Sequence, residues 1–351
     1  MSIVNIYAPN HIDPFDSYGL IACELAEQLE VMGVYVNLMA LGDRHSLGQS
    51  AETKAITQQP ITAAFGGLFL GYPTSYEKHD NPLASMGRRV ALTMFESSIV
   101  PDGWVEALNK MHAVIVPSTF CRDVFADCGV NVTMHVIPLG ISETFKPFWR
   151  PHHPKRPYTF LSIGDRGRRK NVDAALQAFL LAFGGDTNHR LVIKTRDNKK
   201  RSAITFTNPN IDVISQDLTE DELYRLYCDC DCMIFPSRAE GFGLPPREFA
   251  ATGAPAIATN WSGLADDINT WGIPLEYKLA TADWQGSRNL EGQDLGQWAE
   301  PEIEHLADLM KCISQHKQAY RIRAHQAASE IHGLYSWQSF AKGVYDVWRQ
   351  N

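Results

Sequence analysis

The sequence has no apolar run that approaches the roughly 18 to 20 residues of a membrane-spanning helix. Its first residues, Met1 to Tyr7, contain no basic side chain and have the pattern of a β-strand, so no signal peptide is expected. Cysteine is also sparse, because 7 cysteines in 351 residues, an odd number, do not suggest a disulfide framework. These absences predict a cytoplasmic protein with no integral membrane segment.

Several ligand-binding signatures are missing as well. There is no G-x-G-x-x-G dinucleotide fingerprint and no P-loop. The alternating Cys228, Cys230 and Cys232 have no second pair of Cys or His residues at the spacing of a zinc site. The adjacent His152 and His153 lie in a proline-rich linker, where histidines are usually solvated. The sequence therefore predicts no metal site.

Charge is unevenly distributed along the chain. The net charge is −8, but residues 152–201 contain twelve Lys or Arg and four acidic residues, a net +8 that leaves −16 for the remainder. A local basic field in an acidic protein suits an anionic ligand. A solvated basic face is the alternative, and composition does not separate the two. The length and the contents of 44% hydrophobic and 21% charged residues fit a globular protein of two domains.

Strand and helix patterns alternate in the first half of the chain. A strand at Ile3–Ala8, a helix over Tyr18–Met32 and a strand at Val34–Ala40 predict the opening of a doubly wound α/β unit, and further strands are expected at Gly67–Gly71 and Arg89–Phe95. Ligands in such folds bind at the carboxyl ends of the strands, so residues there are candidates for a cleft, although a strand-end acid can also be merely solvated. The candidates are Tyr18, Gly19, Glu96 and Ser97.

The second half begins after a linker, residues 146–157, that contains four prolines. A strand at Thr159–Ile163 leads into the basic turn Gly164–Asn171 and then into a helix over Val172–Phe183. Such a turn can hold a diphosphate between cationic side chains and a helix N-terminus. Exposed loop charges are the plainer interpretation.

The stretch Phe235 to Asn260 organises the rest of the chain. It predicts the end of a buried strand, a loop with Gly241 and Gly243, a short helix that begins at Pro246, and another strand at Pro255–Thr259. The free N–H groups at the start of this helix form a ready anion site. On physical grounds alone, the two glutamates of this stretch are either ligand-binding groups or carboxylates that cap and favour a helix start.

The two glutamates lie in a specific pattern. The run from Glu240 to Pro245, Glu-Gly-Phe-Gly-Leu-Pro, with Glu248 eight positions after the first glutamate, resembles the E-x7-E signature of retaining GT-B glycosyltransferases of family 4. The resemblance implies that Glu240 contacts hydroxyls of the donor sugar and that Glu248 binds the ribose of the nucleotide. It further implies that the sugar and diphosphate face backbone N–H groups of Gly241, Phe242, Gly243 and Leu244.

The same resemblance gives the basic turn a role, because an Arg and a Lys there stabilise the leaving nucleotide diphosphate in the family. Lys170 matches the family lysine. The family arginine directly follows the glycine, where this chain has Asp165, so Arg166 is the best substitute, with Arg168 and Arg169 as rivals. No metal or other cofactor is required if these cations do that work.

Other positions follow from the resemblance. Gly164 belongs to the donor-binding turn, and Lys194 and Leu218 are expected near the nucleotide base. The pair Asp229 and Asp231 is similar to the metal-binding D-x-D of GT-A enzymes, but GT-B relatives carry a structural acid here.

The implied fold is α/β and of the GT-B type, with two Rossmann-like doubly wound domains that face a central cleft and a C-terminal helix that crosses back to the N-domain. The domains are expected at 1–148 with 336–351, on the acceptor side, and at 149–335, which binds the nucleotide sugar. Residues 278–297 are expected to form a long loop near the cleft. Relatives carry a histidine near Glu96, and this chain does not.

The expected activity is transfer of a hexose from a UDP- or GDP-sugar to an acceptor hydroxyl, with retention of configuration and without metal. The acceptor stays open between a glycan, a lipid-linked sugar and modified DNA, since some phage DNA glycosyltransferases are also GT-B proteins. A non-catalytic nucleotide-sugar-binding protein is the alternative of another class. A hydrolase pair of glutamates is disfavoured, because the basic turn has no role in glycoside hydrolysis.

Overall fold

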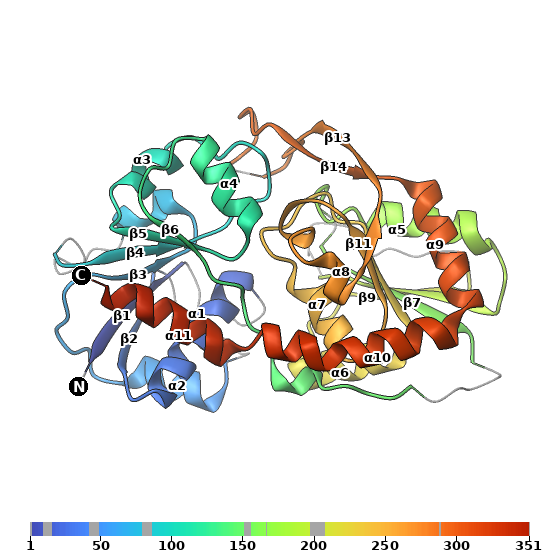
Figure 1. The fold of residues 1–351 in the computed structure, drawn as a ribbon, viewed down its shortest axis with the longest axis horizontal. Coiled ribbons are helices and arrows are strands. Elements are labelled where there is room, and N and C mark those ends of the chain that lie inside the picture. The colour runs from blue at the N-terminus through green and yellow to red at the C-terminus, as the bar shows by residue number, and fades with distance from the viewer. Residues whose placement is uncertain are drawn as a thin grey trace. The chain divides into compact units, whose positions relative to one another are not determined.

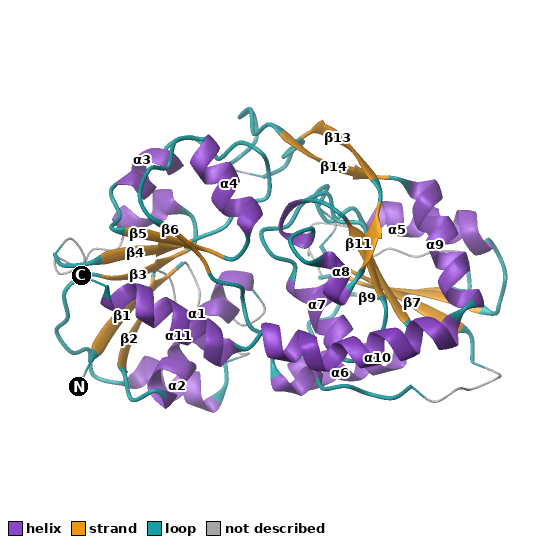
Figure 2. Cartoon of the chain, viewed as in Figure 1, coloured by secondary structure: helices purple, strands orange, loops and turns teal. Residues whose placement is uncertain are grey.

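The computed structural model describes residues 2–9, 16–41, 49–78, 86–150, 156–165, 167–196, 208–287 and 289–350. The chain divides into two compact units. Unit 1 comprises Met1–Gly140 together with Tyr335–Asn351, and unit 2 comprises Ile141–Leu334. Each unit has its own parallel sheet with helices packed around it (Figure 2). The units are described separately below.

Unit 1 is built on a six-stranded sheet whose strands are ordered β2-β1-β3-β4-β5-β6 and pair only in parallel. The strands are short and nearly continuous in apolar residues, as expected for a sheet that is covered on both faces. The strands are β1 (Ile3–Ala8), β2 (Tyr35–Ala40), β3 (Gly67–Leu70), β4 (Arg89–Leu92), β5 (Ala113–Val116) and β6 (Met134–Val136). The helices are α1 (Ser17–Val31), α2 (Ala51–Gln58), η1 (Pro73–Lys78), α3 (Trp104–Asn109), α4 (Thr119–Asp127) and α11 (Trp337–Arg349).

The last helix, α11, returns to unit 1 as predicted. It lies beside α1, so the red and blue ends of the chain meet in Figure 1. The hydroxyl of Ser336 caps α11 by accepting a hydrogen bond from the N–H of Ser339. A Cβ at Gly140 would come within 2.3 Å of the backbone nitrogen of Trp337. Only glycine therefore lets the start of α11 pack this closely against the segment that follows β6.

Unit 2 is built on a second parallel sheet with the strand order β12-β11-β10-β7-β8-β9. This is the strand order of the Rossmann fold. Successive strands are added on one side of β7 up to β9 and on its other side from β10 onward, so the strand order reverses between β7 and β10. The strands are β7 (Tyr158–Ile163), β8 (His189–Lys194), β9 (Ile211–Ile214), β10 (Cys232–Phe235), β11 (Ala256–Thr259) and β12 (Ile273–Leu275). The helices are η3 (Glu143–Phe145), α5 (Val172–Phe183), α6 (Glu220–Asp229), α7 (Leu244–Ala251), η4 (Ser262–Leu264), α8 (Ile268–Trp271), α9 (Ile303–Gln315) and α10 (Lys317–Leu334).

The division between the units falls earlier than the sequence analysis placed it, after Gly140 instead of residue 148. The reason is Arg150, which is 2% exposed and binds carbonyl groups of unit 2. Its Nε donates to the carbonyl oxygen of Cys230 at 2.8 Å, and its Nη2 donates to that of Tyr227 at 2.8 Å. The N–H of Phe148 also donates to unit 2, so the start of the proline-rich linker packs with the second unit.

The long loop expected over residues 278–297 is a β-hairpin at its two ends. Strand β13 (Tyr277–Thr281) pairs antiparallel with β14 (Gln297–Pro301). The pairing has no short-range turn signal in the sequence, because the connection is long. One smaller expectation was also wrong, because α7 begins at Leu244, two residues before Pro246.

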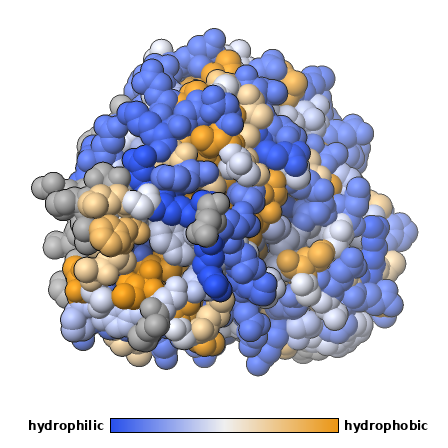
Figure 3. Space-filling model, turned by 60° about the vertical axis from the view of Figure 1, so that its left-hand side comes forward, coloured by the Kyte–Doolittle hydropathy of each residue, from blue (hydrophilic) through white to orange (hydrophobic). Residues whose placement is uncertain are grey.

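The surface is mixed in character. The visible face in Figure 3 is mainly hydrophilic, with smaller hydrophobic patches between the polar residues. Within the described ranges, no helix is both long enough and apolar enough to cross a bilayer.

Candidate functional site

Two loops meet at the point of unit 2 where the strand order reverses. The basic turn follows β7, and the loop that starts at Ser237 follows β10, the neighbouring strand. Ligands of open α/β sheets bind at this place, outside the carboxyl ends of the two strands. A Cβ at Gly164 would lie 2.9 Å from the Cβ of Lys170, so glycine lets the turn fold tightly against the lysine.

The carboxylate of Glu240 is the centre of this site. The Nζ of Lys170 lies 2.7 Å from its Oε1, and the guanidinium of Arg169 lies 2.9 Å from its Oε2. The hydroxyl of Ser237 donates a hydrogen bond of 2.6 Å to the same Oε1. The structure thus brings Glu240 and Lys170, which are separated in sequence by the helices α5 and α6 and the strands β8, β9 and β10, into one ion-pair cluster.

Burial and charge act against each other in this cluster. Glu240 is 5% exposed, and burial raises the pKa of its carboxyl, but Arg169 and Lys170 outweigh this effect and set the pKa at about 2. Burial lowers the pKa of Lys170, and the charge of Glu240 opposes that decrease. Two cations and one carboxylate leave a net positive charge, which suits an anionic ligand.

The basic turn distributes its arginines among different partners. Arg169 contacts Glu240 and also donates to the carbonyl oxygen of Ala239 at 2.7 Å. Arg168 pairs with Asp283 of the β13–β14 connection, and it is therefore directed to the hairpin. Arg166, the arginine favoured by the sequence analysis, lies outside the described residues. Sequence position alone did not identify Arg169, because it is one of three arginines in the same turn.

Glu248 occupies a different environment in the second turn of α7. It is 8% exposed, and its Oε2 accepts a hydrogen bond of 3.1 Å from the hydroxyl of Tyr227. Burial raises the pKa of Glu248 to about 7, although the hydrogen bond from Tyr227 opposes the increase. The two glutamates of the motif therefore differ, since Glu240 is ionised and paired and Glu248 titrates near neutrality. Tyr227 was not identified from the sequence, where nothing distinguishes it from a core tyrosine.

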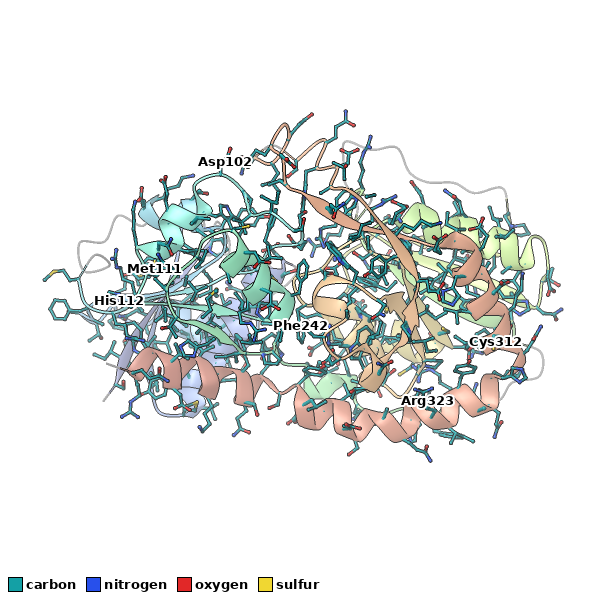
Figure 4. The ribbon with its side chains drawn as sticks, turned by 45° about the horizontal axis from the view of Figure 1, so that its top comes forward. Asp102, Met111, His112, Phe242, Cys312 and Arg323 are labelled. Atoms are coloured by element: carbon teal, nitrogen blue, oxygen red, sulfur yellow. The ribbon has the colours of Figure 1, made fainter. Side chains whose placement is uncertain are left out.

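The backbone between the two glutamates is held in a fixed shape. The N–H of Glu240 donates to the hydroxyl of Ser262 at 2.9 Å, and the N–H of Gly263 donates to the carbonyl of Glu240 at 2.9 Å. Gly243 has φ of 89°, and a Cβ there would come within 2.4 Å of the Cδ2 of Leu264. Only glycine fits that position. Gly241, Gly243 and Leu244 lie in the same segment as Phe242, which Figure 4 labels, and α7 begins at Leu244.

The two positions predicted near a nucleotide base lie at the same end of the sheet. Lys194 ends β8, the strand next to β7, and is 7% exposed. Its Nζ donates to the carbonyl oxygen of Thr195 at 2.7 Å, and burial lowers the pKa of this lysine. Leu218 is half-buried and directly precedes Thr219, the N-cap residue of α6.

The candidates of unit 1 also gather at one sheet edge. Tyr18 and Gly19 lie in the first turn of α1, and the hydroxyl of Tyr18 accepts a hydrogen bond of 3.0 Å from the N–H of Met94. Glu96 and Ser97 follow in the same segment, with Glu96 half-buried and Ser97 buried. Tyr18 therefore ties α1 to the segment that follows β4 and carries Glu96 and Ser97.

Several cations of the basic stretch pair with acids elsewhere in unit 2. Besides the pairs made by Arg168, Arg169 and Lys170, Arg156 pairs with Asp231 and Arg190 pairs with Asp212. Asp231 also accepts a hydrogen bond from the N–H of Thr159 at 2.9 Å, as a structural acid does.

No metal cluster is apparent at this site. Over the described ranges of the chain, no group of three or more His, Cys, Asp and Glu side chains is placed to hold an ion. Cys230 and Cys232 are buried, and burial raises the pKa of both thiols. This is the behaviour of structural cysteines.

Comparison with known proteins decides the family. The model of a family described as family 4 glycosyltransferases in conflict systems matches residues 120–344, well over half of the chain. The chain belongs to this family. The match spans both the basic turn and the E-x7-E stretch, so the resemblance seen in the motif is confirmed.

Individual relatives of this family 4 member are distant. D-inositol 3-phosphate glycosyltransferase of Corynebacterium urealyticum is 30% identical over 129 residues, which are 37% of this chain and 25% of that protein. The chain thus covers about a quarter of the length of this curated relative.

Solved structures resemble the whole chain. Sucrose-phosphate synthase from Thermosynechococcus elongatus matches with a TM-score of 0.71 at 15% identity, covering 100% of this chain and 99% of that one. Anabaena HepE, solved with UDP and glucose, matches with a TM-score of 0.65 at 12% identity and 99% coverage of both chains. At these identities the likeness shows the fold, and the α/β GT-B fold of two Rossmann-like domains is confirmed.

Proposed function

We propose that this protein transfers a sugar from a nucleotide-diphosphate sugar to an acceptor hydroxyl with retention of configuration. The observation that carries the proposal is the Glu240 carboxylate held between Lys170 and Arg169 at the reversal point of the unit 2 sheet. A ligand that combines sugar hydroxyls with a diphosphate matches this combination of one acceptor carboxylate and two cations. Family membership and the relatives named as glycosyltransferases support the same activity.

Each charged group has a role in the proposed reaction. The acceptor oxygen attacks the anomeric carbon on the face from which the diphosphate leaves, the bond between that carbon and the diphosphate oxygen breaks, and the acceptor proton passes to a phosphate oxygen. Lys170 and an arginine of the turn stabilise the charge that develops on the diphosphate. Glu240 orients the sugar hydroxyls, and Glu248 accepts hydrogen bonds from the ribose. No metal or other cofactor is needed in this scheme.

The donor and the location are proposed as follows. HepE, a structural neighbour, was solved with UDP and glucose, which supports a UDP-sugar as a donor for this chain, with a GDP-sugar as the alternative. We assign the nucleotide sugar to unit 2 and the acceptor to unit 1, where Tyr18, Gly19, Glu96 and Ser97 are the candidate contacts. The reaction takes place in the cytoplasm, on a glycan, a lipid-linked sugar or modified DNA.

A donor-hydrolysis screen tests the proposal. Purified protein is incubated with UDP-, GDP- and ADP-sugars, and release of the nucleoside diphosphate is measured. Glu240→Ala abolishes turnover, whereas Glu248→Ala mainly weakens nucleotide binding, because its role is to hold the ribose. Unchanged turnover in Glu240→Ala contradicts the donor-sugar role, and binding without turnover of any donor in the wild type favours a non-catalytic binding protein. Binding to hydroxymethylated DNA is measured at two salt concentrations. A steep loss of affinity at the higher salt supports DNA as the acceptor, whereas no binding at low salt contradicts it.

A further inference from the structure

Arg247 is a buried charge in the middle of the E-x7-E stretch. It lies in the first turn of α7, directly before Glu248, and its side chain is 0% exposed. Its Nη1 donates to the carbonyl oxygens of Phe242 and, at 3.3 Å, Gly243. Its Nη2 donates to the carbonyl oxygen of Gly263 at 2.9 Å. The guanidinium therefore joins three carbonyl groups of two different loop segments.

The surroundings fix this guanidinium in one orientation. Its central carbon lies 4.1 Å from the ring centroid of Phe242 and 4.8 Å from that of Trp271. Oδ1 of Asp267 accepts from Nη2 at 2.6 Å and from the indole N–H of Trp271 at 2.8 Å. Because the charge is paired, stacked and hydrogen-bonded at once, Arg247 is held more firmly than a solvated arginine.

The direction of two peptide groups follows from these hydrogen bonds. In a planar trans peptide the carbonyl and the following N–H point to opposite sides. Since the carbonyls of Phe242 and Gly243 point to Arg247, the N–H groups of Gly243 and Leu244 point away from it. Among the hydrogen bonds formed by described residues, none is donated by either of these N–H groups. Pro245 and Pro246, the next two residues of α7, have no N–H to offer.

We infer that Arg247 is a positioning residue that aims the N–H groups of Gly243 and Leu244 at the diphosphate of the donor. This inference rests on the proposed function, because it assigns a role in the same donor site. Arg247 does not touch the donor. It acts through the peptide groups, whose carbonyls it holds on the protein side while their N–H groups face the ligand.

A buried arginine can also be purely structural, and the chain contains a matched comparison. Arg150 is 2% exposed, donates to four carbonyl groups and stacks on Phe148 and Phe249, so it resembles Arg247 in burial, hydrogen bonding and stacking. It binds the linker to unit 2 and touches neither of the two loops of the site. The loss of folding stability is therefore shared by variants of both residues, while loss of diphosphate binding is specific to Arg247.

The test uses calorimetric titration of the full-length protein with UDP, GDP and inorganic pyrophosphate. In Arg247→Met, affinity for the diphosphates that the wild type binds falls about tenfold to a hundredfold, the expected effect of misdirecting one or two charge-assisted hydrogen bonds. Arg150→Met retains wild-type affinity. Arg247→Lys keeps the charge but lacks the fork that spans separate carbonyls, so its affinity falls as well. If Arg247→Met does not fold, the diphosphate affinity of Arg247→Lys tests the positioning role.

The outcomes separate the inference from the proposed function. Diphosphate binding and sugar transfer by the wild type, together with unchanged affinity in the Arg247 variants, overturn the positioning role alone. Equal losses in Arg150→Met also overturn it, because the effect is then one of general destabilisation. If the wild type neither binds a nucleoside diphosphate nor turns over any donor, the proposed function fails, and the inference fails with it.

Discussion

The raised pKa of Glu248 predicts a pH-dependent gain in stability for Glu248→Gln. The carboxyl has a pKa of about 7 in the folded protein because of burial, against an ordinary value of 4.5. An acid whose pKa is raised by folding contributes its full stability below 4.5 and loses it as the pH rises through 7, since the folded state then has to bury the ionised form. A difference of about 2.5 between the two pKa values corresponds to about 3 kcal/mol above pH 8.

The amide of glutamine is neutral at every pH and has almost the same shape. At pH 5.5 the folded carboxyl is still protonated, and the unfavourable contribution is only about 1 kcal/mol, so the stability of the variant relative to the wild type rises by about 2 kcal/mol between pH 5.5 and 8.5. The assay is urea unfolding of both proteins at the two pH values.

The control is Glu330→Gln, an exposed glutamate in α10 of the same unit, for which the stability difference stays constant. A stability difference between wild type and Glu248→Gln that is the same at both pH values refutes the assignment of a buried, neutral Glu248.

Two further predictions concern the turn and the loop of the site. Lys170→Met lowers kcat for sugar transfer by about a hundredfold to a thousandfold, the range for loss of one preorganised group at a developing negative charge, whereas exposed Lys342→Met leaves kcat unchanged. A wild-type kcat in Lys170→Met refutes its leaving-group role. Gly243→Ala lowers the free energy of unfolding by about 1–3 kcal/mol, because φ is 89° and the new Cβ meets Leu264. Gly333→Ala in α10, where nothing lies within 4 Å of a new Cβ, raises the free energy of unfolding by about 0.5–1 kcal/mol. Equal urea midpoints for the two glycine variants contradict this account.

The regular elements were the most predictable part of the fold. The bounds of α5 (Val172–Phe183) and β1 (Ile3–Ala8) agree with those expected from apolar periodicity, because each contains a regular pattern of buried apolar residues. The hairpin β13–β14 was missed because its pairing depends on contacts across a long connection. Strand β14 also has a partner far away in sequence, since Nη2 of Arg238 lies 2.8 Å from Oε1 of Glu300.

The site was predictable to the extent that its motif is contiguous. Glu240 and Glu248 follow from spacing alone, but their opposite pKa values do not, since these depend on Lys170 and Arg169 in one case and on burial beside Tyr227 in the other. Arg247 lies between the same two glutamates, but no feature of the sequence indicates a role for it. Its role depends on which way its side chain points.

By itself, the sequence determined the fold class and the family, because alternating strand and helix patterns and a contiguous E-x7-E motif are local properties of the chain. Only the tertiary structure decided which cation of the basic turn meets Glu240 and where the linker belongs. It also decided which peptide groups Arg247 orients. The physical reason is that these are interactions between segments distant in sequence, and their geometry is set by the strand order of the sheet and by the burial of charges within it.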